Sequence, residues 1–307
     1  MKGLDDIRFV LIMRKTRLQE LIERFNTWPQ AKFYLEHNNV EVNDYLQEHD
    51  YYQKQLVQAE SILKSLGRFQ LLERSLLPSY QFSQRDIVIV IGQDGLVANT
   101  LKYLNGQPVI AINPDPARWD GKLLPFEIGQ LHDVVLSTLQ DKMPSKSVTF
   151  AQATTNDGQS LLAVNDLFIG PKSHTSARYI MKWNGEQEFQ SSSGIIVSTG
   201  LGSTGWFQSI LAGAKAIMGT NDHPLTEGFA WGDRLLQFTV REPFPSNTTG
   251  VKLVFGTIDE QLPLQLESLM PENGVIFSDG IEDDFIRFNA GCIASIGIAK
   301  TQGQLIG

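Results

Sequence analysis

A glycine-rich turn after an apolar run is the segment of the sequence best suited to chemistry. The run 86–91 is largely β-branched and predicts a buried strand, and Gly92, Gln93, Asp94 and Gly95 follow it just before a helix-like stretch. Glycines let the backbone approach a ligand closely, and the free amides at a helix start favour an anion such as phosphate. A carboxylate at Asp94 would then lie beside the phosphates, where it would take a proton from a hydroxyl group or position Mg²⁺. The alternative for these residues is a tight turn in which Asp94 caps the helix.

A second polar segment, residues 194–206, has a strand-like start, then hydroxyl groups and glycines, then a helix-like stretch. This composition suits hydrogen bonds to a polar ligand at close approach. A serine-hydrolase elbow at Ser203 is disfavoured, because Leu201 stands where that motif needs a glycine. The candidate binding residues of this segment are Thr199, Ser203, Thr204, Gly205 and Trp206.

Two pairs of amide and carboxylate side chains also follow apolar runs. Asn165 and Asp166 suit paired hydroxyl groups such as those of a ribose, and the alternative is a turn with Asx hydrogen bonds. Asn113 and Asp115 follow the strand-like run 108–113, at the edge where open α/β sheets bind ligands. The prolines around Asp115 favour a rigid turn as the alternative there. The acids at 282–284 are interpreted as a solvated surface, and no residue is assigned to a metal.

The elements that must position these residues change in character along the chain. Up to about residue 144, strand-like runs alternate with helix-like stretches, which predicts a parallel sheet with right-handed crossovers. Beyond it, short β-rich runs are separated by Gly, Asn, Asp and Ser, which is typical of antiparallel sheets. We therefore expect an α/β domain at 1–145 and a mainly antiparallel β domain at 146–307. The expected helices are 17–25, 41–66, 97–104 and 206–218, and the later strands include 194–199, 235–240, 251–255 and 294–298.

Composition excludes several classes of partner. The formal net charge is −8 and no basic patch stands out, so neither nucleic acid nor an anionic membrane surface is expected as a partner. No apolar run is long enough for a spanning helix, and the first residues do not form a secretory signal. The single cysteine, Cys292, excludes an intrachain disulfide and lies in an apolar stretch. We expect a cytoplasmic protein.

Taken in order, these segments resemble the NAD kinase family, whose relatives include diacylglycerol and sphingosine kinases. The family hallmark is Gly-Gly-Asp-Gly-Thr after a strand, then Asn-Glu, then a strand leading into a Ser/Thr/Gly-rich turn and an aromatic residue. In these places the chain has residues 92–96, Asn165-Asp166 and 194–206. The resemblance is greatest to the branch that contains the mitochondrial NAD kinases of animals. Similar short sequences occur there at the positions that correspond to 15–17, 109–116, 165–170 and 192–194 of this chain. It covers about residues 8 to 210.

The resemblance implies a Rossmann-like α/β N-terminal domain that binds nucleotide. It also implies a C-terminal β-sandwich that binds the dinucleotide, with the tail returning to the first domain, and a homodimer or homotetramer. The implied reaction moves the terminal phosphate of ATP, with Mg²⁺, to the 2′-hydroxyl of NAD and gives NADP. By the same resemblance, Asp94 would be the base and Gly92, Gln93 and Gly95 would lie beside the phosphates. Asn165 and Asp166 would hold ribose hydroxyl groups or adenine. Ser203 and Thr204 would line the adenine pocket, with Gly205 and Trp206 packing nearby.

Three positions depart from the family pattern. Gln93 replaces the second glycine, Leu96 replaces the threonine, and Asp166 is one methylene shorter than the usual glutamate. The Gln93 side chain would either block a triphosphate or donate a hydrogen bond to it. Two alternatives therefore stand beside an NAD kinase: a kinase of another hydroxyl substrate, a sugar or a lipid, and an NAD(P)-binding protein without catalytic activity.

Overall fold

The computed structural model describes residues 7–219 and 227–307, apart from the side chain of Asp283. The chain divides into two compact units. Unit 1 consists of residues 1–146 together with Gln304–Gly307, and unit 2 consists of Ser147–Gly303. Each unit has its own hydrophobic core.

Unit 1 is built on a parallel sheet in the order β4-β3-β1-β2. The short strand β5 and the last residues of β17 also pair with β4, both in parallel. The central strands β1, β3 and β4 are almost continuously apolar, because the middle of a parallel sheet is covered on both faces. Their bounds are β1 Arg8–Met13, β2 Arg68–Glu73, β3 Asp86–Ile91, β4 Pro108–Asn113, β5 Phe126–Glu127 and β17 Ile293–Ile306.

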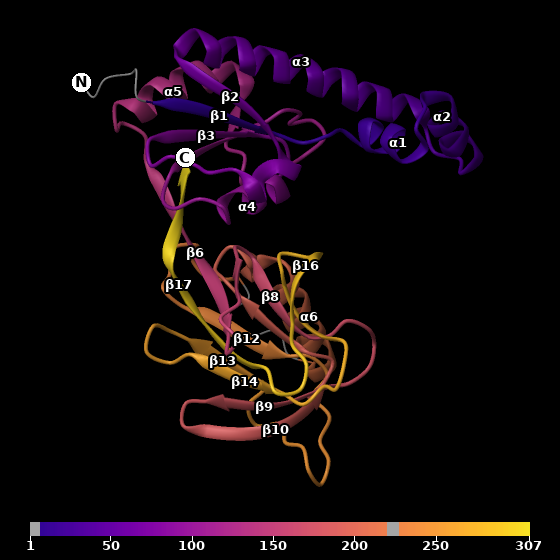
Figure 1. The fold of residues 1–307 in the computed structure, drawn as a ribbon, viewed down its shortest axis with the longest axis vertical. Coiled ribbons are helices and arrows are strands. Elements are labelled where there is room, and N and C mark those ends of the chain that lie inside the picture. The colour runs from indigo at the N-terminus through magenta and orange to yellow at the C-terminus, as the bar shows by residue number, and fades with distance from the viewer. Residues whose placement is uncertain (1–6, 220–226) are drawn as a thin grey trace. The chain divides into compact units, whose positions relative to one another are not determined.

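Helices cover both faces of the parallel sheet (Figure 1). Side chains of α3 and α5 pack with one set of alternate strand residues, among them Leu11, Ile89 and Ile110, and α4 lies on the opposite face. Helices α1 and α2 extend with the first part of α3 beyond the sheet. The bounds are α1 Arg17–Phe25, α2 Trp28–His37, α3 Val42–Leu66, α4 Asp94–Leu101 and α5 Leu131–Leu139, with short 3₁₀ helices η2 at Arg74–Ser79 and η3 at Ile128–Gln130.

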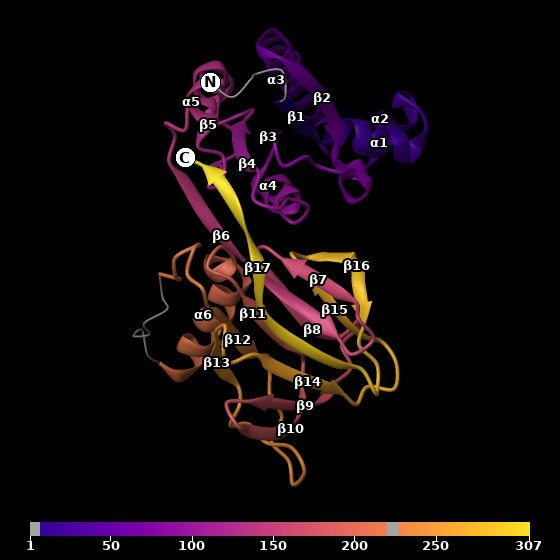
Figure 2. The ribbon, with the colours of Figure 1, turned by 60° about the vertical axis from the view of Figure 1, so that its left-hand side comes forward.

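Unit 2 is a sandwich of two antiparallel sheets. One sheet has six strands in the order β13-β12-β11-β8-β15-β16. Its bounds are β13 Phe255–Ile258, β12 Leu236–Val240, β11 Ile195–Ser198, β8 Asp166–Pro171, β15 Gly274–Ser278 and β16 Ile281–Arg287. The facing strands follow the order β10-β9-β14-β17, and β6 runs beside β17 and pairs with β7 (Figure 2). Their bounds are β10 Glu186–Ser192, β9 Ala177–Trp183, β14 Leu264–Ser268, β6 Ser145–Thr155 and β7 Ser160–Ala163.

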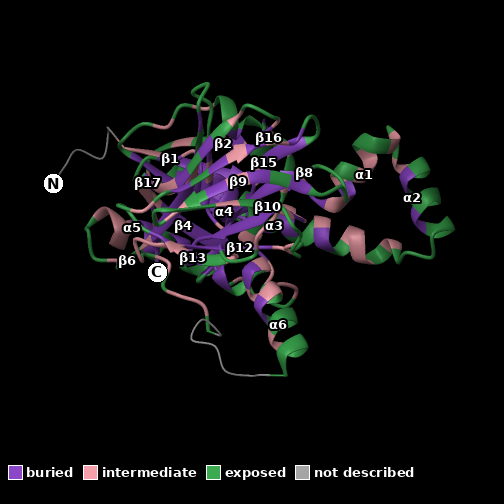
Figure 3. Ribbon diagram, turned by 90° about the horizontal axis from the view of Figure 1, so that it is seen from below, coloured by how far each residue is buried: buried purple, intermediate pink, exposed green. Residues whose placement is uncertain are grey.

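The sandwich core comes from the inner faces of both sheets, with Ile169, Val197 and Phe238 on one side and Tyr179 and Leu266 on the other. Helix α6 (Trp206–Met218) follows the short 3₁₀ helix η4 (Gly202–Thr204) and contacts β11, and side chains near its start join the outer face of the six-stranded sheet. Most strand residues are buried, whereas α2 and α6 are largely exposed (Figure 3).

The predicted fold class, an α/β domain followed by a mainly antiparallel β-sandwich, is confirmed. Several elements were predicted wrongly in detail. The strand expected at 251–255 is instead Phe255–Ile258, because Val251 and Lys252 are exposed and lie outside the ladder. Helix α4 begins at Asp94 rather than at residue 97. The elements α2, α5, β2, β8, β10 and β16 were not expected.

Candidate functional site

Asp94 is the first residue of α4 and follows the carboxyl end of β3 closely. Its carboxylate oxygens accept hydrogen bonds from the backbone N–H groups of Lys122 and Leu123, at 3.1 and 2.9 Å. The supporting loop turns at Gly121, whose φ of +60° is left-handed, and a Cβ there would come within 2.6 Å of Asn113 Nδ2. Glycine is therefore needed at this turn. The loop holds the partly exposed Asp94 side chain in one orientation at the edge of the sheet.

The start of α4 combines backbone amides with an exposed glycine. The Leu96 N–H donates to the Gln93 carbonyl at 2.9 Å, whereas the first two N–H groups, of Asp94 and Gly95, have no acceptor inside the helix and are available to an anion. Gly95 is exposed, and a Cβ added there would meet no described atom within 4 Å. Gly92 is buried, and a Cβ added there would lie 2.8 Å from Leu96 Cδ2. Packing therefore requires Gly92, whereas the surroundings of Gly95 leave room for a ligand.

Asn113 and Asp115 shape the loop that follows β4. Asn113 Nδ2 donates to the Trp119 carbonyl at 2.9 Å, and Asn113 Oδ1 accepts from the Asp115 N–H at 3.1 Å. The Asp115 carbonyl accepts from the N–H groups of Arg118 and Trp119. These contacts match the rigid turn, one of the two interpretations of this segment. They also connect it to the loop that supports Asp94.

A group of paired charges lies at the carboxyl end of β1. Glu48 of α3 is 2% exposed and accepts hydrogen bonds from Arg14 and Arg17. Asp44, one turn earlier on α3, accepts from Arg17 at 2.7 Å and from Arg118 at 2.6 Å. Arg118 belongs to the loop after β4, so this network joins α3 and the end of β1 to that loop. Buried charges are retained when they are paired and hydrogen-bonded, as Glu48 is.

In unit 2, Asn165 and Asp166 lie at the start of β8, beside the turn between β15 and β16. Asp279 of that turn accepts a hydrogen bond from the Asn165 N–H at 2.6 Å. The Asp166 side chain is 7% exposed, and its carboxyl group accepts no hydrogen bond from the described residues. Burial, and then the nearby Asp279 charge, raise the pKa of Asp166 to about 7. A buried carboxyl group without a partner is costly, so Asp166 is suited to meet a polar ligand.

The turn after β11 is held by its own hydroxyl groups. Thr199 Oγ1 donates to the Val164 carbonyl at 2.6 Å, and Ser203 Oγ donates to the Gly200 carbonyl at 2.7 Å. Both side chains are completely buried, so these hydroxyl groups are engaged inside the protein. The exposed residues of the segment are Thr204 and Gly205.

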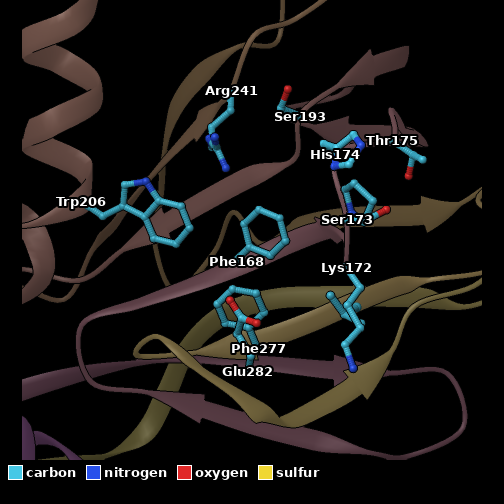
Figure 4. A pocket seen from close by; sticks show the side chains of 12 residues that line it. Phe168, Lys172, Ser173, His174, Thr175, Ser193, Trp206, Arg241, Phe277 and Glu282 are labelled. Carbon is cyan, nitrogen blue, oxygen red and sulfur yellow. The ribbon is translucent and has the colours of Figure 1, made fainter. Parts of the chain in front are cut away.

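Trp206 takes part in a pocket of about 290 Å³ on the outer face of the six-stranded sheet (Figure 4). Its ring stacks on Phe168 with centroids 5.8 Å apart and planes 6° apart, and Phe277 stacks on Phe168 at 4.8 Å. Arg241 and Lys172 also line the pocket. Of these five residues only Trp206 was a predicted binding residue. Phe168 and Lys172 come from β8 and its end, Phe277 comes from β15 and Arg241 follows β12, so no single sequence motif brings all of them together.

Within residues 7–219 and 227–307, no group of three or more His, Cys, Asp or Glu side chains is arranged to hold a metal ion. No helix in the same part of the chain is long and apolar enough to cross a membrane. No protein-family model and no curated protein matches the sequence.

Solved structures do match the fold. Yeast NADH kinase, solved in complex with NADH, matches with a TM-score of 0.59 and 12% identity, over 98% of this chain and 83% of that chain. An NAD kinase from Archaeoglobus fulgidus, solved in complex with ATP, matches with a TM-score of 0.55 and 13% identity, over 98% of this chain and 93% of that chain. The chain therefore has the fold of the NAD and NADH kinases.

Proposed function

We propose that this protein is an NAD kinase-like phosphotransferase, which moves the terminal phosphate of ATP to the 2′-hydroxyl of NAD and gives NADP. The fold shared with two kinases supports this class of reaction. The observation that carries the proposal is the position of Asp94. Asp94 is the first residue of a helix at the carboxyl edge of a parallel sheet. Its carboxylate is partly exposed, and two backbone N–H groups donate hydrogen bonds that hold it in place.

In the proposed reaction, Asp94 accepts the hydroxyl proton of NAD as the new oxygen–phosphorus bond forms. The bond between the terminal phosphorus and its bridging oxygen breaks, and ADP leaves. Each Asp94 oxygen that accepts one N–H keeps a further lone pair for the hydroxyl group. The N–H groups at the start of α4 and the open space at Gly95 would receive the phosphates.

Mg²⁺ would arrive on the phosphates of ATP, as part of the substrate, and neutralise their charge. Within residues 92–96 the only carboxylate is that of Asp94, and backbone N–H groups bind phosphate oxygens rather than a cation. This segment therefore suits a metal ion already carried by phosphate oxygens rather than a site built from protein side chains alone.

Gln93 and Leu96, the two residues beside Asp94 that differ from the NAD kinase pattern, have different consequences. Leu96 is 4% exposed and packs over Gly92, so it supplies an apolar contact where the family threonine has a hydroxyl group. Gln93 is half-buried at the N-cap and makes no side-chain cap hydrogen bond. We assign its amide the role of a donor to a phosphate oxygen.

The proposed contacts in unit 2 divide into two kinds. Asn165 and Asp166 would bind ribose hydroxyl groups or adenine, and the raised pKa of Asp166 lets it act as donor or acceptor near neutral pH. Thr204, Gly205 and Trp206 would lie beside the adenine. Thr199 and Ser203 would act indirectly, because their hydroxyl groups hold the turn.

Two measurements together test the function. NADP formation is followed with purified protein, NAD, ATP and Mg²⁺, and calorimetry measures the binding of NAD and NADP separately. Turnover supports the kinase. Tight binding without turnover would instead identify an inactive NAD(P)-binding protein. Absence of both would contradict the dinucleotide proposal and direct the search to sugar or lipid acceptors.

A further inference from the structure

The pocket of unit 2 has an aromatic floor centred on Phe168. Trp206 and Phe277 stack on this ring. Two glycines make room for it: a Cβ at Gly170 would lie 2.7 Å from the Phe168 ring, and one at Gly194 would lie 2.9 Å from it. The ring therefore packs against the backbone of β8 and of the residue before β11, where larger side chains would displace it. Phe168 is only 5% exposed, so the half-buried rings of Trp206 and Phe277 are the part of this floor that can receive a planar ring.

Positive groups lie around this floor. The Arg241 guanidinium is 5.4 Å from the centroid of the Trp206 ring, and in Figure 4 it extends toward the centre of the pocket. Its ion pair with the exposed Glu242 is long, at 3.7 Å. Apart from a ring contact with Phe285, the Lys172 ammonium has no hydrogen bond or ion pair with a described residue. Both cations are therefore available to an anion.

The balance of charge in the pocket opposes that of the whole protein. The net charge of the chain is −8, yet Glu282 is the only carboxylate among the lining residues, against the two cations Lys172 and Arg241. Hydroxyl groups that make no side-chain hydrogen bond with a described residue add further donors, at Ser173, Thr175 and Ser193. This arrangement favours a negatively charged ligand.

We propose that this pocket binds a small ligand that combines a planar aromatic ring with an anionic group, such as an aromatic phosphate monoester or carboxylate. The ring would lie against Trp206, which Phe168 supports from beneath, and the anionic group would bind Arg241 and Lys172. The volume of about 290 Å³ is close to the lower end of the usual range for ligand pockets, which suits a small molecule. The proposal does not depend on phosphotransfer, because none of the catalytic groups assigned around Asp94 lines the pocket, although Trp206 is shared with the proposed adenine contacts.

Phenyl phosphate is the probe, because it joins one ring to one anionic group. Calorimetry measures its Kd for the full chain without ATP or NAD. The Arg241→Gln variant should bind at least about tenfold more weakly, since a charge-assisted contact is lost, and Lys172→Gln should weaken binding less. Arg287→Gln is the matched control, because Arg287 is exposed on β16 of the same sheet and does not line the pocket. It should leave the Kd unchanged.

Ligand fragments separate the two parts of the proposed ligand. Inorganic phosphate and phenol should each bind at least about tenfold more weakly than phenyl phosphate, because each lacks one of its two contacts. Benzoate, tested in parallel, distinguishes a carboxylate ligand from a phosphate ester. No binding of either aromatic anion would overturn the proposal, and so would equal binding by wild type and a folded Arg241→Gln variant. Loss of NADP formation would leave these results untouched, so the two proposals can fail separately.

Discussion

The carboxylate of Asp94 and the backbone N–H of Leu123 lie 2.9 Å apart, although 29 positions separate them in the sequence. Asp94 begins the helix after β3, and Leu123 belongs to the loop after β4, the strand that pairs with β3. The hydrogen bond therefore joins the ends of two neighbouring strands. Because a general base must be oriented as well as present, we interpret this loop as part of the proposed catalytic machinery.

Asn113→Ala tests the role of the loop. The substitution removes the hydrogen bonds to the Trp119 carbonyl and from the Asp115 N–H, which should lower the free energy of unfolding by about 1–2 kcal/mol. We expect kcat for NADP formation to fall about tenfold, because Asp94 loses its fixed orientation. Asn156→Ala is the control, since Asn156 also bonds backbone groups, at Gly291 and Ile293, but lies in unit 2. If both variants keep the wild-type kcat, the loop does not position Asp94.

The two glycines beside Asp94 should respond differently to alanine. Gly92→Ala places a Cβ 2.8 Å from Leu96 Cδ2 and should destabilise the protein by about 1–3 kcal/mol. Gly95→Ala meets no described neighbour and should leave stability unchanged or raise it by up to about 1 kcal/mol. The methyl group that Gly95→Ala adds should lower kcat/KM for ATP at least about tenfold, because it occupies the space proposed for the phosphates. Thermal unfolding measures the effect on stability, and steady-state kinetics with ATP measures the effect on kcat/KM. A fully active Gly95→Ala variant would show that the phosphates do not bind at Gly95.

Asp166 should make stability depend on pH. Burial and the Asp279 charge raise its pKa from 3.8 to about 7, so the folded state retains a proton that the unfolded state releases between these values. The contribution of Asp166 to stability is therefore most favourable below about pH 4 and becomes less favourable as the pH rises to about 7. Asp166→Asn should be more stable than wild type at pH 8, by on the order of 2–4 kcal/mol, with the difference vanishing near pH 4. Urea unfolding at several pH values measures this, and a pH-independent difference would contradict it.

Glu48 should be important for the stability of unit 1. Glu48→Ala leaves Arg14 and Arg17 without their shared buried partner and should lower the free energy of unfolding by about 3 kcal/mol. Glu36→Ala removes an exposed ion pair with Lys32, at 3.7 Å, and should change it by less than about 1 kcal/mol. Urea unfolding compares the two variants. Equal losses would mean that the buried network contributes no more than a surface pair.

Elements with strong apolar patterns were predictable from the sequence. The strand at 86–91 and the helix at 206–218 have the predicted bounds, because local composition alone specifies them. The strands β10 and β16, with the sequences EQEFQSS and IEDDFIR, were missed. Both lie at the edges of their sheets, where few side chains must be apolar and pairing with a neighbouring strand determines the structure.

Only the part of the candidate site whose residues are contiguous in the sequence was predictable. Asp94 at the start of a helix follows from a strand, a turn and a helix in sequence order. The groups that support Asp94 could not be predicted in this way. They are backbone N–H groups 28 and 29 positions away, and no side-chain type marks them in the sequence. The pocket was missed for a related reason: Phe168, Arg241 and Phe277 become neighbours only when the six-stranded sheet forms.

The role of Asp94 as the base is tested by kcat for NADP formation, measured for Asp94→Asn and wild type at saturating NAD, ATP and Mg²⁺. We expect a fall of about 10²- to 10⁴-fold, because the variant lacks a base, while calorimetry shows that NAD still binds. Asp133→Asn is the control, since the Asp133 side chain is 88% exposed and lies on α5, away from the residues proposed for the site. It should keep the wild-type kcat. A folded Asp94→Asn variant that forms NADP at the wild-type rate would show that Asp94 is not the base.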